Sequence, residues 1–154
     1  MNIITQLPLA LALLTINTMA YDATKAQELD TFYSAMTQKA CADSKLFVEA
    51  KDAMKMIRDN NITLLDVRTI GEESVISLSK KHAVHIPIKD LFKKENLAKI
   101  PTDKPIVLVC HSGTRGTLAA IGLKRIGFDK VHVLKGGLVG LAIENNPKNA
   151  PVLK

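Results

Sequence analysis

One segment constrains the fold of this chain most: a β-branched apolar run that leads through a short polar loop into a helical pattern. The run is Ile106–Val109 (IVLV), and Cys110–Arg115 (CHSGTR) follows it directly. From Gly116 to Ile126 apolar residues return at helical spacing, which predicts a helix. Its expected inner side carries Leu118, Ile121 or Gly122, and Ile126. A strand that leads through a loop into a helix is typical of α/β proteins.

Four further apolar runs are predicted to be strands. They are a minor strand at Leu46-Phe47, then Ile62–Val67, Ala83–Ile88 and Val131–Leu134. Glu49–Arg58 has helical periodicity, so strands and helices alternate along the chain. Strands that are apolar throughout are typical of parallel sheets covered by helices on both faces. We therefore expect an α/β fold of three layers, with a central, mostly parallel five-stranded sheet flanked by helices.

The chain has 154 residues, enough for one domain with a core of its own. Its organisation is predicted as residues 1–20, a signal peptide; 21–43, a helical extension that packs on the domain; 44–144, the α/β domain; and 145–154, a loosely ordered tail.

The first 20 residues contain no charged side chain. Their apolar run, Leu7–Ile16, is too short to span a bilayer and suits a secretory signal. Thr18 and Ala20 are small residues that fit a cleavage site before Tyr21. A periplasmic or otherwise exported protein with no stable membrane span after export is therefore expected. Because this segment lacks Lys and Arg, an uncleaved anchor or a buried helix remains an alternative.

Composition excludes several classes of function. The net charge is +6, but the Lys residues are scattered and the chain has no Trp, so a nucleic-acid partner is not expected. Two cysteines, Cys41 and Cys110, are too few for a disulfide scaffold and too far apart for a zinc pair. Cys41 is read as a free or buried thiol, with a resolving thiol as the alternative. His82, His85 and His132 have no carboxylate or cysteine completing a set, so no metal is expected. The protein is expected to be a monomer.

The loop after Ile106–Val109 carries the chemistry that the sequence predicts. Cys110 lies where a strand ends and a helix begins, so main-chain amides and the helix dipole favour its thiolate. Gly113 permits the turn. Ser112 and Thr114 can donate hydroxyl hydrogen bonds to a bound anion, and Arg115 can hold an oxyanion. We expect an exposed, negatively charged sulfur in this cradle; the alternative is an ordinary buried cysteine at the end of a strand.

Four segments resemble the rhodanese domain, the fold of thiosulfate sulfurtransferases. They are Leu64–Thr69 with Glu72, Ala83–Pro87, Cys110–Arg115 and Lys135–Leu138, in the family's order and spacing. The resemblance covers Leu46 to roughly Ala142, and Leu78–His82 departs from the family's usual sequence.

The resemblance implies a sulfurtransferase that carries sulfur as a persulfide on Cys110. It assigns substrate binding to His111, Ser112, Gly113, Thr114 and Arg115. Asp66 and Arg68 either set the electrostatics of the loop or form a structural hydrogen-bond network at the end of a strand, which is the favoured interpretation. The implied donor is a small anion such as thiosulfate or a persulfide, the acceptor is a thiol, a protein or cyanide, and no cofactor is needed.

Two other functions stay open. One is a non-catalytic sulfur carrier or protein-docking module that uses the same cradle. The other is a cysteine-dependent phosphatase or arsenate reductase, which resembles the family but has one more loop residue. The loop here has six residues from cysteine to arginine, which favours sulfur transfer.

Overall fold

The computed structural model describes residues 20–149 of the chain. The predicted signal peptide therefore lies almost entirely outside the described residues. The chain divides into two compact units after Ala35, and each unit is described by itself. No helix among the residues described has the length and apolarity needed to cross a membrane.

The predicted helical extension is helical in two pieces. The first, α1 (Ala23–Ser34), begins at Asp22, whose carboxylate accepts a hydrogen bond from the Lys25 amide at 3.0 Å. This cap satisfies one of the free amides at the helix start. The second, α2 (Gln38–Asp43), belongs to the larger unit and is capped by Thr37. Packing of the extension on the α/β domain stays a prediction.

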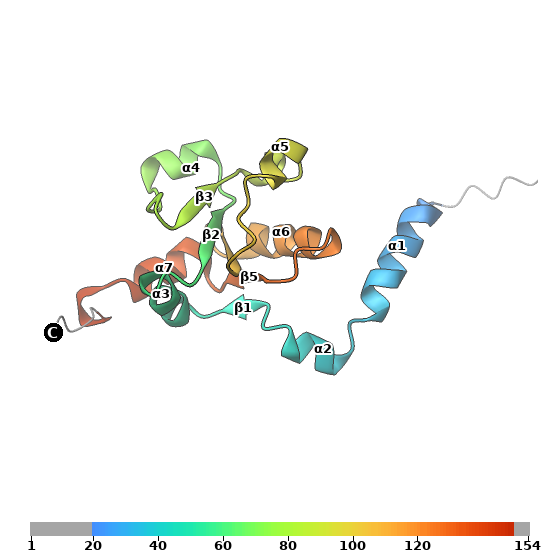
Figure 1. The fold of residues 1–154 in the computed structure, drawn as a ribbon, viewed down its shortest axis with the longest axis horizontal. Coiled ribbons are helices and arrows are strands. Elements are labelled where there is room, and N and C mark those ends of the chain that lie inside the picture. Colours follow the sequence, from blue (N-terminus) through green and yellow to red (C-terminus); the bar gives the residue numbers. More distant parts are fainter. Residues whose placement is uncertain (1–19, 150–154) are drawn as a thin grey trace, which may run out of the picture. The chain divides into compact units, whose positions relative to one another are not determined.

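The larger unit is built on a five-stranded sheet (Figure 1). Its strands are β1 (Phe47–Val48), β2 (Thr63–Asp66), β3 (Ala83–His85), β4 (Ile106–Val109) and β5 (Val131–Leu134). Their order across the sheet is β1-β5-β4-β2-β3, and every neighbouring pair is parallel. The predicted α/β class and parallel sheet are confirmed, and β4 is the central strand.

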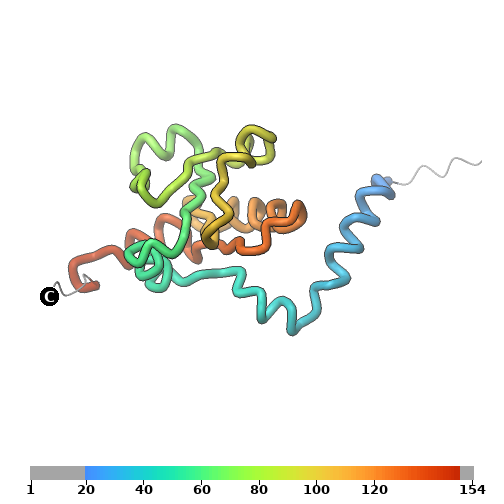
Figure 2. The backbone as a smooth tube through the Cα atoms, in the orientation of Figure 1, coloured from blue at the N-terminus to red at the C-terminus, as the bar shows by residue number. Residues whose placement is uncertain are grey.

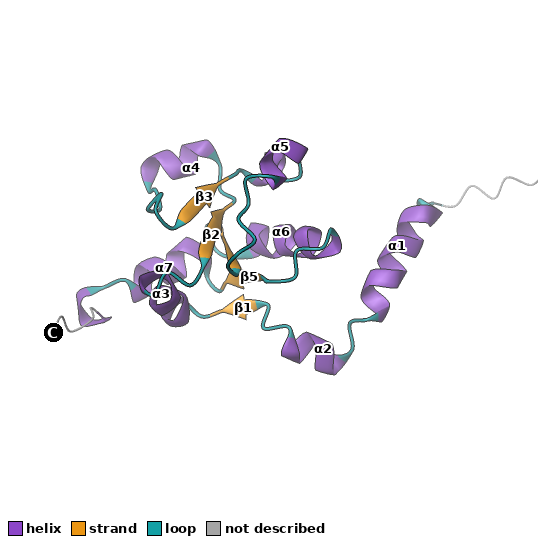
Figure 3. Cartoon of the chain, in the orientation of Figure 1, coloured by secondary structure: helices purple, strands orange, loops and turns teal. Residues whose placement is uncertain are grey.

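Helices connect the strands and cover the sheet (Figure 3). They are α3 (Ala50–Arg58), α4 (Ile70–Val75), α5 (Lys94–Leu97), α6 (Thr114–Arg125) and α7 (Gly137–Glu144), with short 3-10 helices η1 (Ile88–Asp90) and η2 (Pro147–Asn149). One core layer joins α3 and α7 to one face of the sheet, and a second joins α6 to the other. The second 3-10 helix lies within the segment that was predicted to be a loosely ordered tail.

The central strand shows why such an apolar run forms a buried strand. Successive side chains of a strand point to opposite faces. Ile106 and Leu108 accordingly pack in the layer with α6, whereas Val107 and Val109 pack in the layer with α3 and α7. All four are buried, as the β4 sequence requires.

The prediction of which residues form the buried face of α6 is wrong. Leu118 and Ile126 are 62% and 52% exposed, and the buried residues of this helix are Gly116, Ala119, Ala120 and Leu123. Small residues bring the helix close to the sheet: a Cβ on Gly116 would lie 3.1 Å from the Val133 side chain. The prediction failed because it ranked side chains by hydrophobicity, whereas close packing selected Gly and Ala for this face.

Candidate active site

The predicted nucleophile lies at the carboxyl end of the central strand. Cys110 directly follows β4, and α6 begins four residues later, at Thr114. Figure 2 traces this path, and it also shows β1 and β5, which are distant in sequence, running side by side. Ligands of open α/β sheets bind at this edge. Gly113, which precedes α6, has φ of 115°, a backbone conformation that glycine adopts without steric cost.

The Cys110 sulfur lies under its own loop. The backbone amide of Gly113 donates to Sγ at 3.1 Å, so an amide of the predicted cradle faces the sulfur. Cys110 is only 2% exposed, however. The prediction of an exposed sulfur is therefore wrong in this structure. The residue packs in the core layer that contains α6, because it continues the alternation of the buried strand.

Arg115 is bound to a carboxylate of the same domain rather than presenting a free guanidinium. Its Nη1 and Nη2 donate to Glu72 at 2.7 and 2.6 Å. The hydrogen bonds to the Glu72 carboxylate raise the pKa of Arg115. The two hydrogen bonds from Arg115 lower the pKa of Glu72 far below its ordinary value, with help from the Thr69 amide. Paired donors of this kind fix geometry as well as charge.

Glu72 also caps the helix that carries it. The Thr69 hydroxyl accepts from the Glu72 amide at 3.2 Å, and the Glu72 carboxylate accepts from the Thr69 amide at 3.0 Å. This reciprocal arrangement is a capping box. The Glu72 side chain thus joins the start of α4 to Arg115 in the first turn of α6. Its role was missed from sequence, although the Thr-x-x-Glu spacing could have indicated the cap.

Asp66 and Arg68 form a buried network at the end of β2. Nε and Nη2 of Arg68 donate to the Asp66 carboxylate at 2.6–3.0 Å, and both side chains are at most 2% exposed. Nη2 also donates to the Ile76 carbonyl at 2.8 Å, beyond the end of α4. The hydrogen bonds to the Asp66 carboxylate raise the pKa of Arg68. These contacts fit the structural interpretation of the two residues.

The remaining loop side chains lie at the surface. His111, Ser112 and Thr114 are exposed. Ser112 and Thr114, but not His111, line a hollow of about 410 Å³. It is lined by Phe47, Ser112, Gly113, Thr114, Thr117, Leu118, Lys135 and Gly136.

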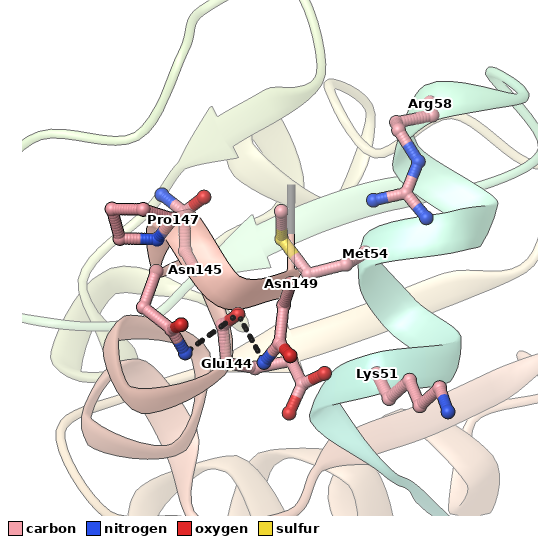
Figure 4. Close-up of a pocket in the computed structure, with 8 residues that line it drawn as sticks. Lys51, Met54, Arg58, Glu144, Asn145, Pro147 and Asn149 are labelled. Carbon is pink, nitrogen blue, oxygen red and sulfur yellow. Dashed lines mark hydrogen bonds between the residues drawn. The ribbon is translucent and has the colours of Figure 1, made fainter. Parts of the chain in front are cut away.

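A second hollow, of about 450 Å³, contains none of the predicted site residues (Figure 4). Lys51, Met54 and Arg58 line it from α3, and Glu144–Pro147 and Asn149 close it from the C-terminal segment. The Asn149 amide donates to the Glu144 carbonyl at 3.0 Å across its floor. Within residues 20–149, including this hollow, no group of three or more His, Cys, Asp or Glu side chains is placed to hold a metal ion.

The larger unit contains a stretch that matches a known domain family. The model of the rhodanese-like domain matches residues 49–144, more than half of the chain. The chain belongs to the rhodanese-like domain family. The match lies within the larger unit and spans the Asp66–Arg68 network, Glu72 and the whole Cys110–Arg115 loop.

Several relatives of known sequence match the same region. A protein named sulfurtransferase from Allochromatium vinosum is 28% identical over 102 residues, 64% of this chain and 89% of its own. A Bacillus subtilis protein named as the sulfurtransferase YtwF is 34% identical over 62% of this chain and 87% of its own. The Mycobacterium tuberculosis protein MoeZ, named as an adenylyltransferase/sulfurtransferase, is 37% identical over 56% of this chain. The chain spans only about a fifth of the length of MoeZ.

Solved structures agree with the family assignment. A rhodanese-related protein from Thermoplasma volcanium superposes with a TM-score of 0.56 at 27% identity, over 65% of this chain and 93% of its own. The Bacillus anthracis protein titled CoADR-RHD gives the same TM-score and identity over 66% of this chain and 17% of its own.

Proposed function

We propose that this protein is a sulfurtransferase that carries a sulfane sulfur as a persulfide on Cys110. In the first step the Cys110 thiolate attacks the outer sulfur of thiosulfate. A Cys110–sulfur bond forms, the sulfur–sulfur bond of the donor breaks, and sulfite leaves with the electron pair. In the second step an acceptor thiolate or cyanide attacks the outer sulfur of the persulfide, and the Cys110 thiolate is released.

One observation carries this proposal: the Gly113 amide points at Sγ from 3.1 Å, immediately before the N-terminus of α6. An amide and a helix N-terminus stabilise negative charge, on a thiolate or on a persulfide. Rhodanese-like family membership and the relatives named as sulfurtransferases support the same chemistry. The six-residue loop favours sulfur over the larger phosphate or arsenate group.

The burial of Cys110 restricts the donor. With 2% of the residue exposed, a reacting atom must approach through a narrow opening or during an excursion of the loop. Thiosulfate and persulfides both present a terminal sulfur with no substituent on its outer side. Such an atom is the smallest electrophilic sulfur available, so these donors suit the site. The net charge of +6 favours the encounter with anionic donors at low salt.

A non-catalytic carrier or docking module is the second candidate, because the same burial would slow turnover. The two are separated by thiocyanate release from thiosulfate and cyanide, measured for the purified protein. A sulfurtransferase turns over many times, Cys110→Ser abolishes release and Cys41→Ser does not. A docking module releases no thiocyanate, and a phosphatase instead hydrolyses an aryl phosphate.

Export is part of the proposal, since residues 1–20 contain an apolar run without charged side chains. Fractionation of expressing cells, followed by N-terminal sequencing, tests it. Export with cleavage predicts a mature chain that begins at Tyr21 in the periplasmic or secreted fraction. An intact Met1 terminus in the cytoplasmic fraction would contradict it.

A further inference from the structure

We infer that the N-terminus of α7 holds the active-site loop in its working conformation, and that Gly137 is the positioning residue that makes this contact possible. The inference rests on the proposed function, because it concerns how the Cys110 cradle is kept in shape. Two hydrogen bonds carry it. The Leu138 amide donates to the Cys110 carbonyl at 2.8 Å, and the Val139 amide donates to the His111 carbonyl at 3.2 Å.

These amides are the free donors of a helix start. The first amides of any helix have no partner within it and need acceptors elsewhere. In α7 they bind the first two carbonyls of the Cys110–Arg115 loop, and these bonds fix the orientation of two peptide units of the loop. The same loop turns the Gly113 amide toward Sγ, so fixing its first two peptide units supports that contact. The N-termini of two helices thus contact the same loop. Gly113, which caps α6, donates its amide to the sulfur, and the first turn of α7 binds two carbonyls of the loop.

Gly137 is needed because the loop lies directly against the helix start. Its φ is 56°, in the left-handed region. A Cβ at this position would lie 2.5 Å from the Cys110 carbonyl oxygen and 2.7 Å from both the carbon and the oxygen of the His111 carbonyl. Those atoms are backbone atoms of the catalytic loop, so a side chain here forces the loop to move. The preceding Gly136 also has positive φ, 71°, and completes the turn out of β5.

The chain offers a matched control. Gly127 also has positive φ, 98°, but a Cβ there has no neighbour within 4 Å. Gly127→Ala therefore introduces backbone strain without touching the loop, whereas Gly137→Ala introduces strain and displaces the loop. The difference between the two variants isolates the positioning role from a general loss of stability.

The experiment measures the rate at which Cys110 takes up one sulfur from thiosulfate in a single turnover, by mass spectrometry of folded protein. Gly137→Ala is expected to slow uptake at least about tenfold, the scale of weakening one hydrogen bond to a charged group. Gly127→Ala is expected to keep the wild-type rate. Equal rates for both variants would overturn the inference. If the wild-type protein takes up no sulfur, the proposed function fails instead.

A second measurement does not depend on sulfur uptake, so it tests the contact between α7 and the loop even if the wild-type protein takes up no sulfur. Hydrogen exchange of the Gly113 amide, followed by NMR, is expected to accelerate in Gly137→Ala and not in Gly127→Ala, because the bond to Sγ is lost. Unchanged exchange in Gly137→Ala would contradict the inference.

A further pair of variants covers the case in which Gly137→Ala does not fold. Val139→Pro removes the amide that bonds His111, at a first-turn position where helices tolerate proline, and the Val139 side chain is 43% exposed. Val139→Ala truncates the same side chain and keeps the amide. Sulfur uptake is expected to be about threefold slower in the proline variant than in the alanine variant, the effect of one hydrogen bond. Equal rates in the pair would overturn the inference.

Discussion

Arg115 and Glu72 form a two-pronged ion pair between the first turns of α6 and α4, with both nitrogen–oxygen distances at 2.6–2.7 Å. The two residues lie 43 positions apart in sequence, and their pairing ties the end of the Cys110–Arg115 loop to the helix that follows β2. The arginine that sequence reasoning assigned to an oxyanion substrate is thus engaged by a carboxylate of its own domain. Its guanidinium fixes the loop's last residue in place.

Glu72→Gln is expected to lower the rate of sulfur transfer on the order of tenfold, because the released Arg115 no longer fixes the end of the loop. The cost in stability is expected to be only about 1 kcal/mol, since both side chains are about one-third exposed. Steady-state thiocyanate release and urea unfolding measure the two effects. The neighbouring Glu73→Gln removes a charge of the same sign and serves as control. A Glu72→Gln enzyme as active as the Glu73→Gln enzyme would refute this role.

Stability is expected to depend on Glu72 at acid pH. The hydrogen bonds from Arg115 and the Thr69 amide lower its pKa from the ordinary value of 4.5. A carboxylate with a lowered pKa contributes stability that is fully present above the unfolded value and is lost as pH falls toward the folded value. The difference in unfolding free energy between wild type and Glu72→Gln should therefore be constant near neutrality and shrink below about pH 4.5. A difference that is the same at pH 7 and pH 3 would contradict the ion pair.

Arg68→Met is expected to destabilise the domain by about 3–5 kcal/mol, because it leaves the Asp66 carboxylate buried without its cation. Asp66 and Arg68 are 1% and 2% exposed. The matched control is Lys39→Met, which breaks an exposed pair with Asp43 and should change stability by less than about 0.5 kcal/mol. Urea denaturation compares them. If the two losses are similar, the buried network is not a stabilising element.

Cys41 is expected to take no part in the reaction. It is a free, exposed thiol in α2. Cys41→Ser should therefore keep the wild-type kcat and KM for thiosulfate, with and without a reducing agent in the assay. A kcat reduced several-fold would identify Cys41 as a resolving thiol, the alternative that the sequence left open.

The sequence predicted the sheet well because its strands are unusually clear. Ile106–Val109 and Val131–Leu134 agree with the observed strands at both ends, since apolar β-branched runs between turn residues have few alternatives. Ala83–Ile88 was too long by three residues: the strand ends at His85, and Pro87 precedes a 3-10 turn. The short helix α4 was not predicted, because six residues carry little periodicity.

The contacts of the candidate site could not be predicted from the sequence, and the roles of its residues stay predictions. The Cys110–Arg115 loop was singled out by its place between a strand and a helix and by its resemblance to the rhodanese loop. The pairing of Arg115 with Glu72 and the contact of Gly137 with the loop join residues far apart in sequence, so no local pattern revealed them. Cys110 is buried because it continues the alternation of β4 into the layer that contains α6, which the sequence suggested only as the alternative to an exposed sulfur.

The persulfide on Cys110 is the central claim, and intact-protein mass spectrometry after treatment with thiosulfate tests it most directly. We expect a one-sulfur increment that peptide mapping places on Cys110. Cyanide or a thiol should remove it, and Cys110→Ser should not form it. An unmodified protein, or an increment that maps to Cys41, would contradict it.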